Sequence, residues 1–515
     1  MNSRACNELT LADIVVVGNG ALGLFLADEL AGRNSQKKIA VVGPRDRNGG
    51  ASQAAGAMLG CFSEVTNDTL RTDASRARFE IGVGAHEYWD SSLKTLQVFA
   101  PNNRPLKVAD DTYVILNSSG SQLDSIHLDS IIDALESYDK PWEEVDAEAI
   151  RGLNPKPNCR AFRAIRLPEE GAVDARAVLS ALESKLQARG VVLVDQSVKQ
   201  LQCSFGKVNG VQLQDGQLIE SDTVVVAAGA RSEELIRTAD EELDMIPTFA
   251  GLGLGIISKR TNGSGFRSVV RTPNRGFACG LHVVPNGNGR EYLGATNRIV
   301  PHVATGACFE DLSYFTRCAM EQLDENIATH EIEHLLRGNR PITLDGYPLI
   351  GSFPVDGLYL MTGTYRDGFH SAPLIAVHMA NKMEGLPGVI STLFEPCRNP
   401  IESRTRDQSV EDFVQHSIAM WYESSADAPF STQKLTDLYT EQAIGQYEKL
   451  SIEYALSPDV LWYSIRSPAG AERIKDYLDT LQLDEISPLA NIFRTGLKNT
   501  GYKNKGYENA GVIKP

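Results

Sequence analysis

The feature that most constrains this chain is a glycine-rich turn between an apolar run and a helical stretch. The run Ile14–Val17 leads into Gly18-Asn19-Gly20-Ala21-Leu22-Gly23, and helical spacing continues to Leu30. In such a turn the first glycine makes the tight bend, the second lets the backbone approach a pyrophosphate, and the third lets the helix pack on the strand. The helix N-terminus then directs its partial positive charge at the phosphates. The pattern predicts a dinucleotide-binding site whose cofactor contacts are Gly18, Asn19, Gly20, Ala21, Leu22 and Gly23.

The adenosine end of this site departs from the usual pattern. An acidic residue about 20 positions further on normally holds the ribose hydroxyls at the end of the second strand. Here the second apolar run ends in Val42-Gly43-Pro44-Arg45-Asp46, so Gly43 stands where the acid is expected. Either Asp46 or backbone and water take that role.

Other apolar runs predict a parallel sheet flanked by helices. The runs Ile39–Val42, Val191–Val194 and Thr223–Ala227 are short, rich in valine or isoleucine and bounded by turn residues. The segment Val173–Arg189 has helical spacing. Residues from about 245 to 300 alternate in polarity, which is typical of antiparallel strands. The chain is therefore expected to be an α/β protein.

From about residue 400 the pattern becomes helical. Val410, Phe413 and Ile418 begin a series of apolar positions at helical spacing that runs to about 485. These stripes need a partner surface, so we expect a helical layer that docks on the rest of the protein or on a second subunit. The tail from Asn499 is expected to be mobile.

A second run of small residues extends from Gly50 to Gly60 and permits close backbone approach to a flat ligand. It is similar to the Ser-x-Ala-Ala-Gly-Met-Leu segment that passes the flavin in glycine oxidase-like flavoproteins. The strand Thr223–Ala227, which ends in Ala-Gly, resembles a second FAD-contacting strand of those proteins. The cofactor contacts expected from these segments are Ser52, Gln53, Ala54, Met58, Leu59, Ala228 and Gly229, with Val198 after the third run.

The most specific resemblance lies further along the chain. Arg340-Pro341 is followed by Asp345-Gly346-Tyr347-Pro348-Leu349-Ile350-Gly351 and then by Gly363-Thr364-Tyr365-Arg366-Asp367-Gly368-Phe369. This order resembles the signature of the glycine oxidase / D-amino-acid oxidase (DAO) family. Thr364 stands where that family usually has a histidine. The cofactor contacts that the resemblance implies here are Gly363, Arg366, Asp367, Gly368 and Phe369.

The resemblance also implies substrate contacts. Arg340 matches the arginine that binds the substrate carboxylate, and a planar guanidinium suits bidentate binding of that group. Arg366 matches a second arginine, with Tyr365 beside it. His282 stands where the family has a carboxylate-binding tyrosine, so its role could differ. The candidate catalytic residues are Arg340, Arg366, His282 and Tyr365.

For the fold, the resemblance implies a Rossmann-like FAD-binding domain of the glutathione-reductase type, interleaved with an antiparallel-sheet substrate domain. The flavoprotein body would span residues 1–390, with FAD-binding segments at about 10–65, 150–240 and 340–390. Substrate-domain segments would lie at about 66–149 and 241–339, and residues 391–515 would form the helical extension.

For the reaction, the resemblance implies oxidation of an amino acid or related amine. Hydride passes to flavin N5, an imine forms, and O2 or another acceptor reoxidises the flavin. FAD is expected to be non-covalent, because the stretch where the sarcosine oxidase branch has its flavin-linking cysteine is Leu336–Arg340, without one. The alternatives are a 2-hydroxy acid dehydrogenase, an RNA-modification module and a non-catalytic flavoprotein.

Net charge and cysteine spacing indicate which classes of partner to expect. The formal net charge of −16 disfavours nucleic acid and anionic membrane surfaces. The eight cysteines are scattered without a C-x-x-C pair or metal-ligand spacing, which favours reduced thiols and no metal site. With no signal peptide or membrane span evident, we expect a cytoplasmic enzyme that acts on a small molecule; homo-oligomer formation is left open.

Overall fold

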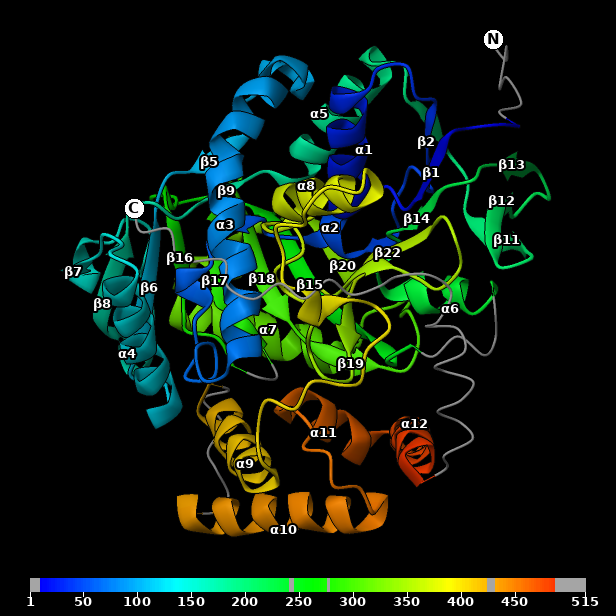
Figure 1. Cartoon of the computed structure of the whole chain (residues 1–515). Helices are drawn as coiled ribbons and strands as arrows, with labels where there is room; N and C mark the ends of the chain where they lie inside the picture. Colours follow the sequence, from blue (N-terminus) through cyan, green and yellow to red (C-terminus); the bar gives the residue numbers. More distant parts are fainter. Residues whose placement is uncertain (1–9, 240–244, 276–277, 424–430, 487–515) are drawn as a thin grey trace.

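A computed structural model describes residues 10–239, 245–275, 278–423 and 431–486. Two large sheets and their helices form the body, and four further helices lie together at its lower edge in Figure 1. This arrangement confirms the expected α/β class.

The first sheet carries the glycine turn. Its order is β10 (Val192–Val194), β2 (Ile39–Val42), β1 (Ile14–Val17), β14 (Val224–Val226), β22 (Leu358–Thr362) and β21 (Leu349–Ser352). The first five strands are parallel and β21 is antiparallel to β22. The four apolar runs expected to be parallel strands are confirmed.

The two faces of this sheet bury different partners, because alternate residues of a strand point in opposite directions. Val16 packs into the core formed with α1 (Ala21–Arg33), α5 (Ala175–Ala188) and α8 (Ala372–Met383). Val15 and Val17 pack into a second core. That core includes the antiparallel sheet of β11 (Val198–Ser204), β12 (Lys207–Leu213) and β13 (Leu218–Glu220).

The second large sheet is mostly antiparallel. Its order is β3 (Gly49–Gly50), β20 (Glu331–Thr343), β15 (Thr248–Lys259), β18 (Arg290–Thr296), β17 (Ala278–Pro285), β16 (Val269–Arg271), β6 (Thr112–Asn117), β8 (Ala161–Leu167) and β7 (Glu143–Val145), with β19 (Arg298–Val300) paired to β15. The antiparallel strands expected between about 245 and 300 are confirmed as β15, β17 and β18.

One boundary differs from expectation. Strand β8 lies within the segment 150–240 that we expected in the FAD-binding part, yet it pairs with β6 in the second sheet. The adjacent residues Ala164 and Ile165 point to opposite faces of the strand, and both are buried, in two different cores. The remaining described elements include α2 (Ala51–Ala54), β4 (Met58–Leu59), α3 (Asp73–Leu96), β5 (Lys107–Ala109), α4 (Gln122–Ser137), β9 (Gly171–Val173), α6 (Ser232–Ile236) and α7 (Phe309–Gln322).

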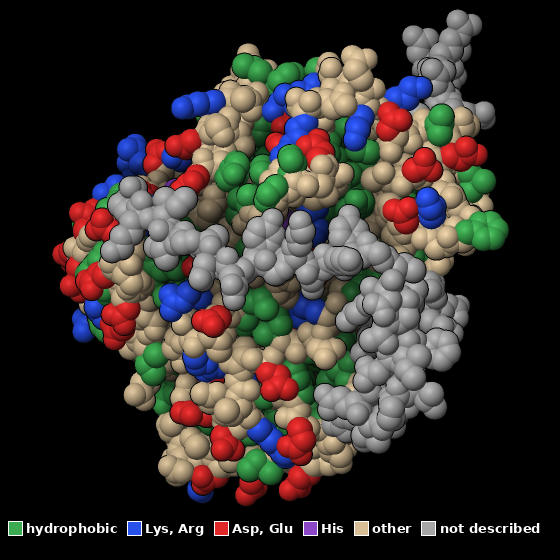
Figure 2. Space-filling view, in the orientation of Figure 1, with side chains coloured by type: hydrophobic (Ala, Val, Ile, Leu, Met, Phe, Trp, Pro, Cys, Tyr) green, Lys and Arg blue, Asp and Glu red, His purple; other side chains and the backbone are tan. Residues whose placement is uncertain are grey.

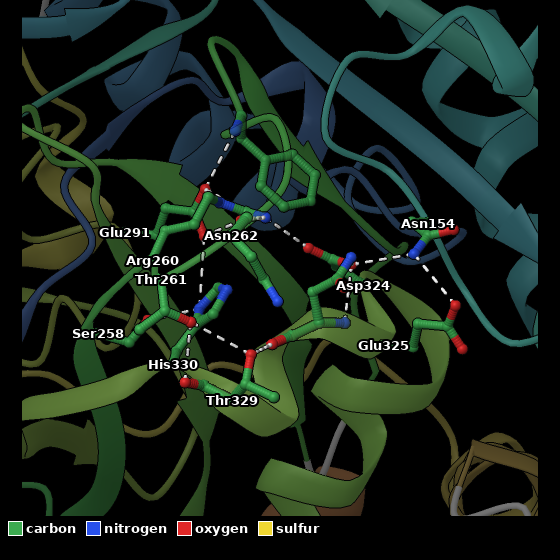
Figure 3. A network of polar contacts seen from close by, with 12 residues as sticks. Asn154, Ser258, Arg260, Thr261, Asn262, Glu291, Asp324, Glu325, Thr329 and His330 are labelled. Atoms are coloured by element: carbon green, nitrogen blue, oxygen red, sulfur yellow. Dashed lines mark hydrogen bonds and ion pairs between the residues drawn. The ribbon is translucent and has the colours of Figure 1, made fainter.

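A buried ion network closes one end of the second sheet (Figure 3). Arg260 follows β15 and donates to Glu291 of β18 at 2.9 Å and to Asp324 after α7 at 2.8 Å. All three side chains are at most 6% exposed. Each charge therefore has a partner, which buried ionised groups require.

The expected helical layer is present as α9 (Arg406–Glu423), α10 (Thr432–Leu450), α11 (Pro458–Arg466) and α12 (Pro468–Ile486), here called the extension. Its apolar stripe, including Phe413 and Tyr447, joins the same core as Val15 of the first sheet. The extension therefore docks on the body of its own chain. The tail from Asn499, expected to be mobile, lies outside the described residues.

Buried charges also fasten the extension. Arg275 lies between Asp124 of α4 and Glu423 of α9, at 2.7 Å from each, and is 4% exposed. Arg473 of α12 binds Glu233 of α6 at 2.7 Å. No helix among the described residues has the length and apolarity needed to cross a bilayer.

We expect Arg275→Met to lower the free energy of unfolding by about 3–5 kcal/mol, because Asp124 and Glu423 would remain buried without their counter-charge. Urea denaturation measures the change. Arg163→Met is the control: Arg163 also bridges two carboxylates, but its side chain is 32% exposed, so the expected loss is at most about 1 kcal/mol. Equal losses in the two variants would contradict the importance of this buried contact.

Candidate functional site

A cavity of about 570 Å³ runs from the glycine turn to the loop that follows β22. Gly43, Asp46 and Lys199 line one end, and His282, Arg340 and Tyr365 line the other. The cavity is therefore elongated between the two large sheets, with different chemistry at its two ends.

Two glycines of the turn are required by backbone packing. Gly18 has φ +120°, and a Cβ there would lie 2.2 Å from the carbonyl oxygen of Ala227. A Cβ at Gly23 would lie 1.9 Å from the carbonyl oxygen of Gly18. No other residue type fits either position, so strand β1, helix α1 and strand β14 can meet only through glycine.

Gly20 differs from these two. Its φ of −76° suits any residue, and the nearest atom to an added Cβ is Ser52 Oγ at 3.1 Å. Ser52 Oγ in turn accepts a hydrogen bond from the backbone N–H of Ala21 at 3.0 Å. Gly20 thus keeps space open where the N-terminus of α1 faces the cavity, as a phosphate-binding turn requires.

Most of the expected cofactor contacts line this cavity. They are Gly18, Asn19, Gly20, Ala21, Leu22, Ser52, Gln53, Ala54, Met58, Val198, Ala228, Gly229, Arg366, Asp367, Gly368 and Phe369. Gly23, Leu59 and Gly363 do not line it. Gly23 packs against Val16, Leu59 is buried in β4, and Gly363 adopts φ +73° in the turn after β22.

At the adenosine end, Gly43 leaves room for Asn19, whose side chain would lie 2.6 Å from an added Cβ. Asp46 lines the cavity there, and its Oδ1 accepts from the Asn48 N–H at 3.2 Å. The Asp46 carboxylate is therefore part of the cavity wall, as the first of the two alternatives for the ribose contact requires.

At the opposite end, Arg340 projects from β20 next to β15. Its Nη1 donates to the Thr296 carbonyl at 3.0 Å and to Asn297 Oδ1 at 3.3 Å. A Cβ at Gly253 would lie 2.3 Å from Nη1, so this glycine makes room for the guanidinium. No carboxylate among the described residues forms an ion pair with Arg340, so its positive charge is uncompensated in the cavity wall.

Tyr365 and Arg366 lie beside Arg340 in one hydrogen-bond network. Asn297 Nδ2 donates to Tyr365 Oη, and Arg366 Nη2 donates to the same oxygen at 3.1 Å. The Arg366 guanidinium also lies 4.8 Å from the centre of the Tyr365 ring, in cation–π contact. Asp459 of the extension accepts from Tyr365 Oη at 3.2 Å. The structure thus brings Arg340, Tyr365 and Arg366 together, as expected.

His282 faces the same end of the cavity from β17. Its Nδ1 lies 3.0 Å from the Gly280 carbonyl, which can only accept, so Nδ1 carries the proton and Nε2 is an acceptor. Burial, helped by the positive charge of Arg271, lowers the pKa of His282 to about 4. The imidazole is therefore neutral near pH 7, and its ring stacks on Tyr292 with centres 5.8 Å apart.

Several site residues carried no local sequence signal. Glu64 lines the cavity and binds Arg271 at 2.8 Å and Asn274 at 3.3 Å. Burial raises the pKa of the Glu64 carboxyl, but Arg271, Arg366 and Asn274 together outweigh this effect and the pKa is lowered. These residues come from two segments about 200 positions apart, so only the folded protein reveals the cluster. Asn297 and Asp459 were missed for the same reason.

Comparison with known families identifies one match. The model of the DAO family, described as FAD dependent oxidoreductase, matches residues 13–382. The match covers the body, and the helices of the extension lie outside it.

Curated relatives agree with this match. A bifunctional protein ThiO/ThiG from Synechocystis is 26% identical over 374 residues, which are 71% of this chain and 51% of the relative. This chain therefore matches about half the length of that protein. A glycine oxidase from Pseudomonas aeruginosa is 27% identical over 385 residues, covering 73% of this chain and 96% of the relative.

Solved structures show the same fold. A glycine oxidase from Bacillus cereus superposes with a TM-score of 0.62 at 20% identity, covering 76% of this chain and 100% of that chain. An iminodiacetate oxidase from Chelativorans also has a TM-score of 0.62, at 16% identity, covering 74% of this chain and 98% of that one.

We expect Gly20→Val to abolish FAD binding while the protein stays folded, because the side chain would fill ligand space without meeting backbone. Flavin absorbance of the purified protein, with circular dichroism for folding, measures both effects. Gly445→Val is the control, since nothing lies within 4 Å of a Cβ added at that position of α10.

Acid precipitation of the FAD-loaded wild-type protein should release its FAD, because we expect the cofactor to be bound non-covalently. Flavin that stays on the precipitated chain would contradict this expectation.

Proposed function

Because this chain belongs to the DAO family of FAD dependent oxidoreductases, we propose that it oxidises an amino acid or a related amine that carries a carboxylate. The observation that carries the proposal is the uncompensated guanidinium of Arg340 beside the neutral imidazole of His282, at the end of the cavity remote from the glycine turn. Two of the similar proteins, a glycine oxidase and an iminodiacetate oxidase, are named for substrates of this class, which supports the proposal.

The cavity wall suits FAD. The glycine turn and the N-terminus of α1 would hold the pyrophosphate, and the segment from Ser52 to Met58 would follow the ribitol and ring. No cysteine stands among the described residues that line the cavity, which favours non-covalent binding. When bound, FAD supplies a hydride acceptor at N5.

Arg340 would bind the substrate carboxylate. The guanidinium is held by Thr296 and Asn297 through neutral acceptors, so its charge is still available for an anion. A planar fork fixes both distance and orientation of a carboxylate. Anchoring that end would place the carbon bearing the amine against the flavin, which is the main task of the protein in hydride transfer.

His282 would contact the amine. Its Nε2 can accept a hydrogen bond from a neutral substrate amine, and a pKa of about 4 keeps the imidazole from retaining the proton. The substrate then loses a hydride from carbon and a proton from nitrogen, which gives an imine. Water hydrolyses the imine to a carbonyl and an amine or ammonia, and O2 or another acceptor takes the two electrons.

The alternatives differ from this proposal in measurable ways. A 2-hydroxy acid would use the same arginine, because the carboxylate is common to both substrates. An RNA-modification module would be expected to carry a broad basic surface. The face drawn in Figure 2 instead has Lys and Arg side chains interspersed with Asp and Glu, which disfavours this alternative. A non-catalytic flavoprotein would keep its flavin oxidised with every compound.

Anaerobic mixing with a panel of amino acids, amines without a carboxylate and 2-hydroxy acids separates these classes. We expect loss of the oxidised flavin absorbance with one or more carboxylate-bearing amines. Bleaching by 2-hydroxy acids alone would favour the alternative substrate. Bleaching only by amines without a carboxylate would contradict the role of Arg340, and an unchanged spectrum with the whole panel would favour a non-catalytic flavoprotein.

For the compound that bleaches the flavin, Arg340→Ala should lower kcat/KM by about 30- to 4000-fold. This corresponds to the ~2–5 kcal/mol typical of removing one partner of a desolvated ion pair. Arg340→Lys should recover only part of the activity, because a point charge lacks the planar fork. FAD content should stay normal.

Arg298→Ala is the matched control for this prediction. Arg298 lies in β19, which pairs with β15 as the strand of Arg340 does, but it is already paired with Glu310 and Asp311. Its removal should leave kcat/KM near the wild-type value. Wild-type kinetics in Arg340→Ala would show that the carboxylate binds elsewhere.

A further inference from the structure

The extension contributes one carboxylate to the site described above. Helix α11 contacts β19, the strand that begins directly after Asn297. Asp459 lies in the first turn of α11, and its side chain is 13% exposed. Because the family match ends at residue 382, this carboxylate comes from a part of the chain that the match does not cover.

Asp459 is bound into the network around the two arginines. Its Oδ1 accepts from Asn297 Nδ2 at 3.2 Å, and its Oδ2 accepts from Tyr365 Oη at 3.2 Å. The other end of the same Asn297 amide accepts from Arg340. One carboxylate of the extension therefore fixes the amide that orients the proposed carboxylate-binding guanidinium.

The same carboxylate balances the charge of Arg366. Asp459 Oδ2 lies 4.0 Å from Arg366 Nη2, whereas Arg340 forms no ion pair with a described carboxylate. The carboxylate thus compensates the Arg366 guanidinium, as Glu64 of the same cavity wall does for Arg271. A substrate meets one uncompensated positive charge instead of two.

A second cavity shows that Asp459 is within reach of a larger ligand. It has a volume of about 240 Å³ between the body and the extension, and Asp459 lines it. Tyr365 and Arg366 line both this cavity and the first one. A group extending from a substrate past Tyr365 would therefore approach Asp459 and Arg366.

We propose that Asp459 is a positioning residue that sets charge selectivity: it orients Asn297 and balances Arg366, so that the site accepts one carboxylate and rejects a second. The inference rests on the proposed function, because it assumes that Arg340 binds a carboxylate. A second anionic group would meet the Asp459 carboxylate, and a like charge in a desolvated site is strongly unfavourable.

The test uses the FAD-loaded enzyme and simple anions as probes. Acetate and propionate represent one carboxylate, and malonate and succinate represent two; binding is followed through the perturbation of the flavin absorbance. The wild type should prefer the monocarboxylates. In Asp459→Asn, the ratio of dicarboxylate to monocarboxylate affinity should rise at least about tenfold, because the amide keeps hydrogen bonds but removes the negative charge.

Two variants serve as controls for this result. Asp459→Glu keeps the charge and should keep the wild-type preference. Asp437→Asn makes the same charge change at an exposed position of α10 and should leave the ratio unchanged. A purely structural role of Asp459 would weaken both classes of probe alike, so an unchanged ratio in FAD-loaded Asp459→Asn would overturn the proposal.

The pH dependence of the wild type tests the same point if Asp459→Asn fails to fold. Burial raises the pKa of Asp459 to about 6, although Arg366, Tyr365 and Arg404 around it favour the ionised form. His416, which lines the same cavity, has a pKa well below its ordinary value, chiefly through burial, and stays neutral. Protonation of Asp459 below about pH 6 should therefore raise the affinity for 1,2-ethanedisulfonate relative to methanesulfonate, two probes whose charge is constant from pH 5 to 8. Burial also raises the pKa of Asp412, which lies against Arg404, to about 6, so the same shift must persist in Asp412→Asn.

The two proposals fail in different ways. If no anion perturbs the wild-type flavin and no carboxylate-bearing amine bleaches it, the proposed function fails and the role of Asp459 fails with it. If the wild type binds the anions through Arg340 but neither Asp459→Asn nor low pH changes the ratio, only the charge-selectivity proposal is overturned.

Discussion

The close approach of β1, α1 and β14 at the glycine turn is the constraint on which the rest of the structure depends. Gly18 lies against the Ala227 carbonyl and Gly23 against the Gly18 carbonyl, so these backbones touch where any side chain would separate them. This contact fixes the helix N-terminus at the end of the parallel sheet. It also places the strand end at Ala228 beside the turn, and the cavity opens along that edge.

The second sheet supplies the polar side chains at the end of the cavity remote from the glycine turn. Strand β20 begins as an exposed edge strand and ends against the first sheet, so Arg340 reaches the cavity from the opposite side to the glycine turn. The neighbouring strand β15 adds Gly253, which gives the guanidinium room, and β17, two strands further across the sheet, adds the neutral His282. In the proposed function the two sheets have different tasks: the first would offer backbone N–H groups to phosphates, and the second would offer side chains to a substrate.

Structural features that depend on local residue patterns could be predicted from the sequence. The turn, the parallel strands and the helices of the extension follow from residue spacing, and the resemblance around Arg340 identified one end of the site. Spacing cannot report contacts between distant segments, so the pairing of Glu64 with Arg271 and of Asp459 with Tyr365 was invisible. Gly23, Leu59 and Gly363 lie outside the cavity lining, because a motif position does not reveal whether a residue faces a cavity or packs behind it.

Buried ion pairs fix the position of the extension on the body, in addition to the apolar contacts between them. Apolar side chains alone would let four helices slide on the body, since hydrophobic contact is not directional. The buried Arg275 instead meets Glu423, and the buried Glu233 meets Arg473; a buried ion without its partner is costly. These contacts restrict the extension to one docked arrangement. In that arrangement the first turn of α11 lies beside Asn297, so the same charges that dock the extension also determine where Asp459 meets the site.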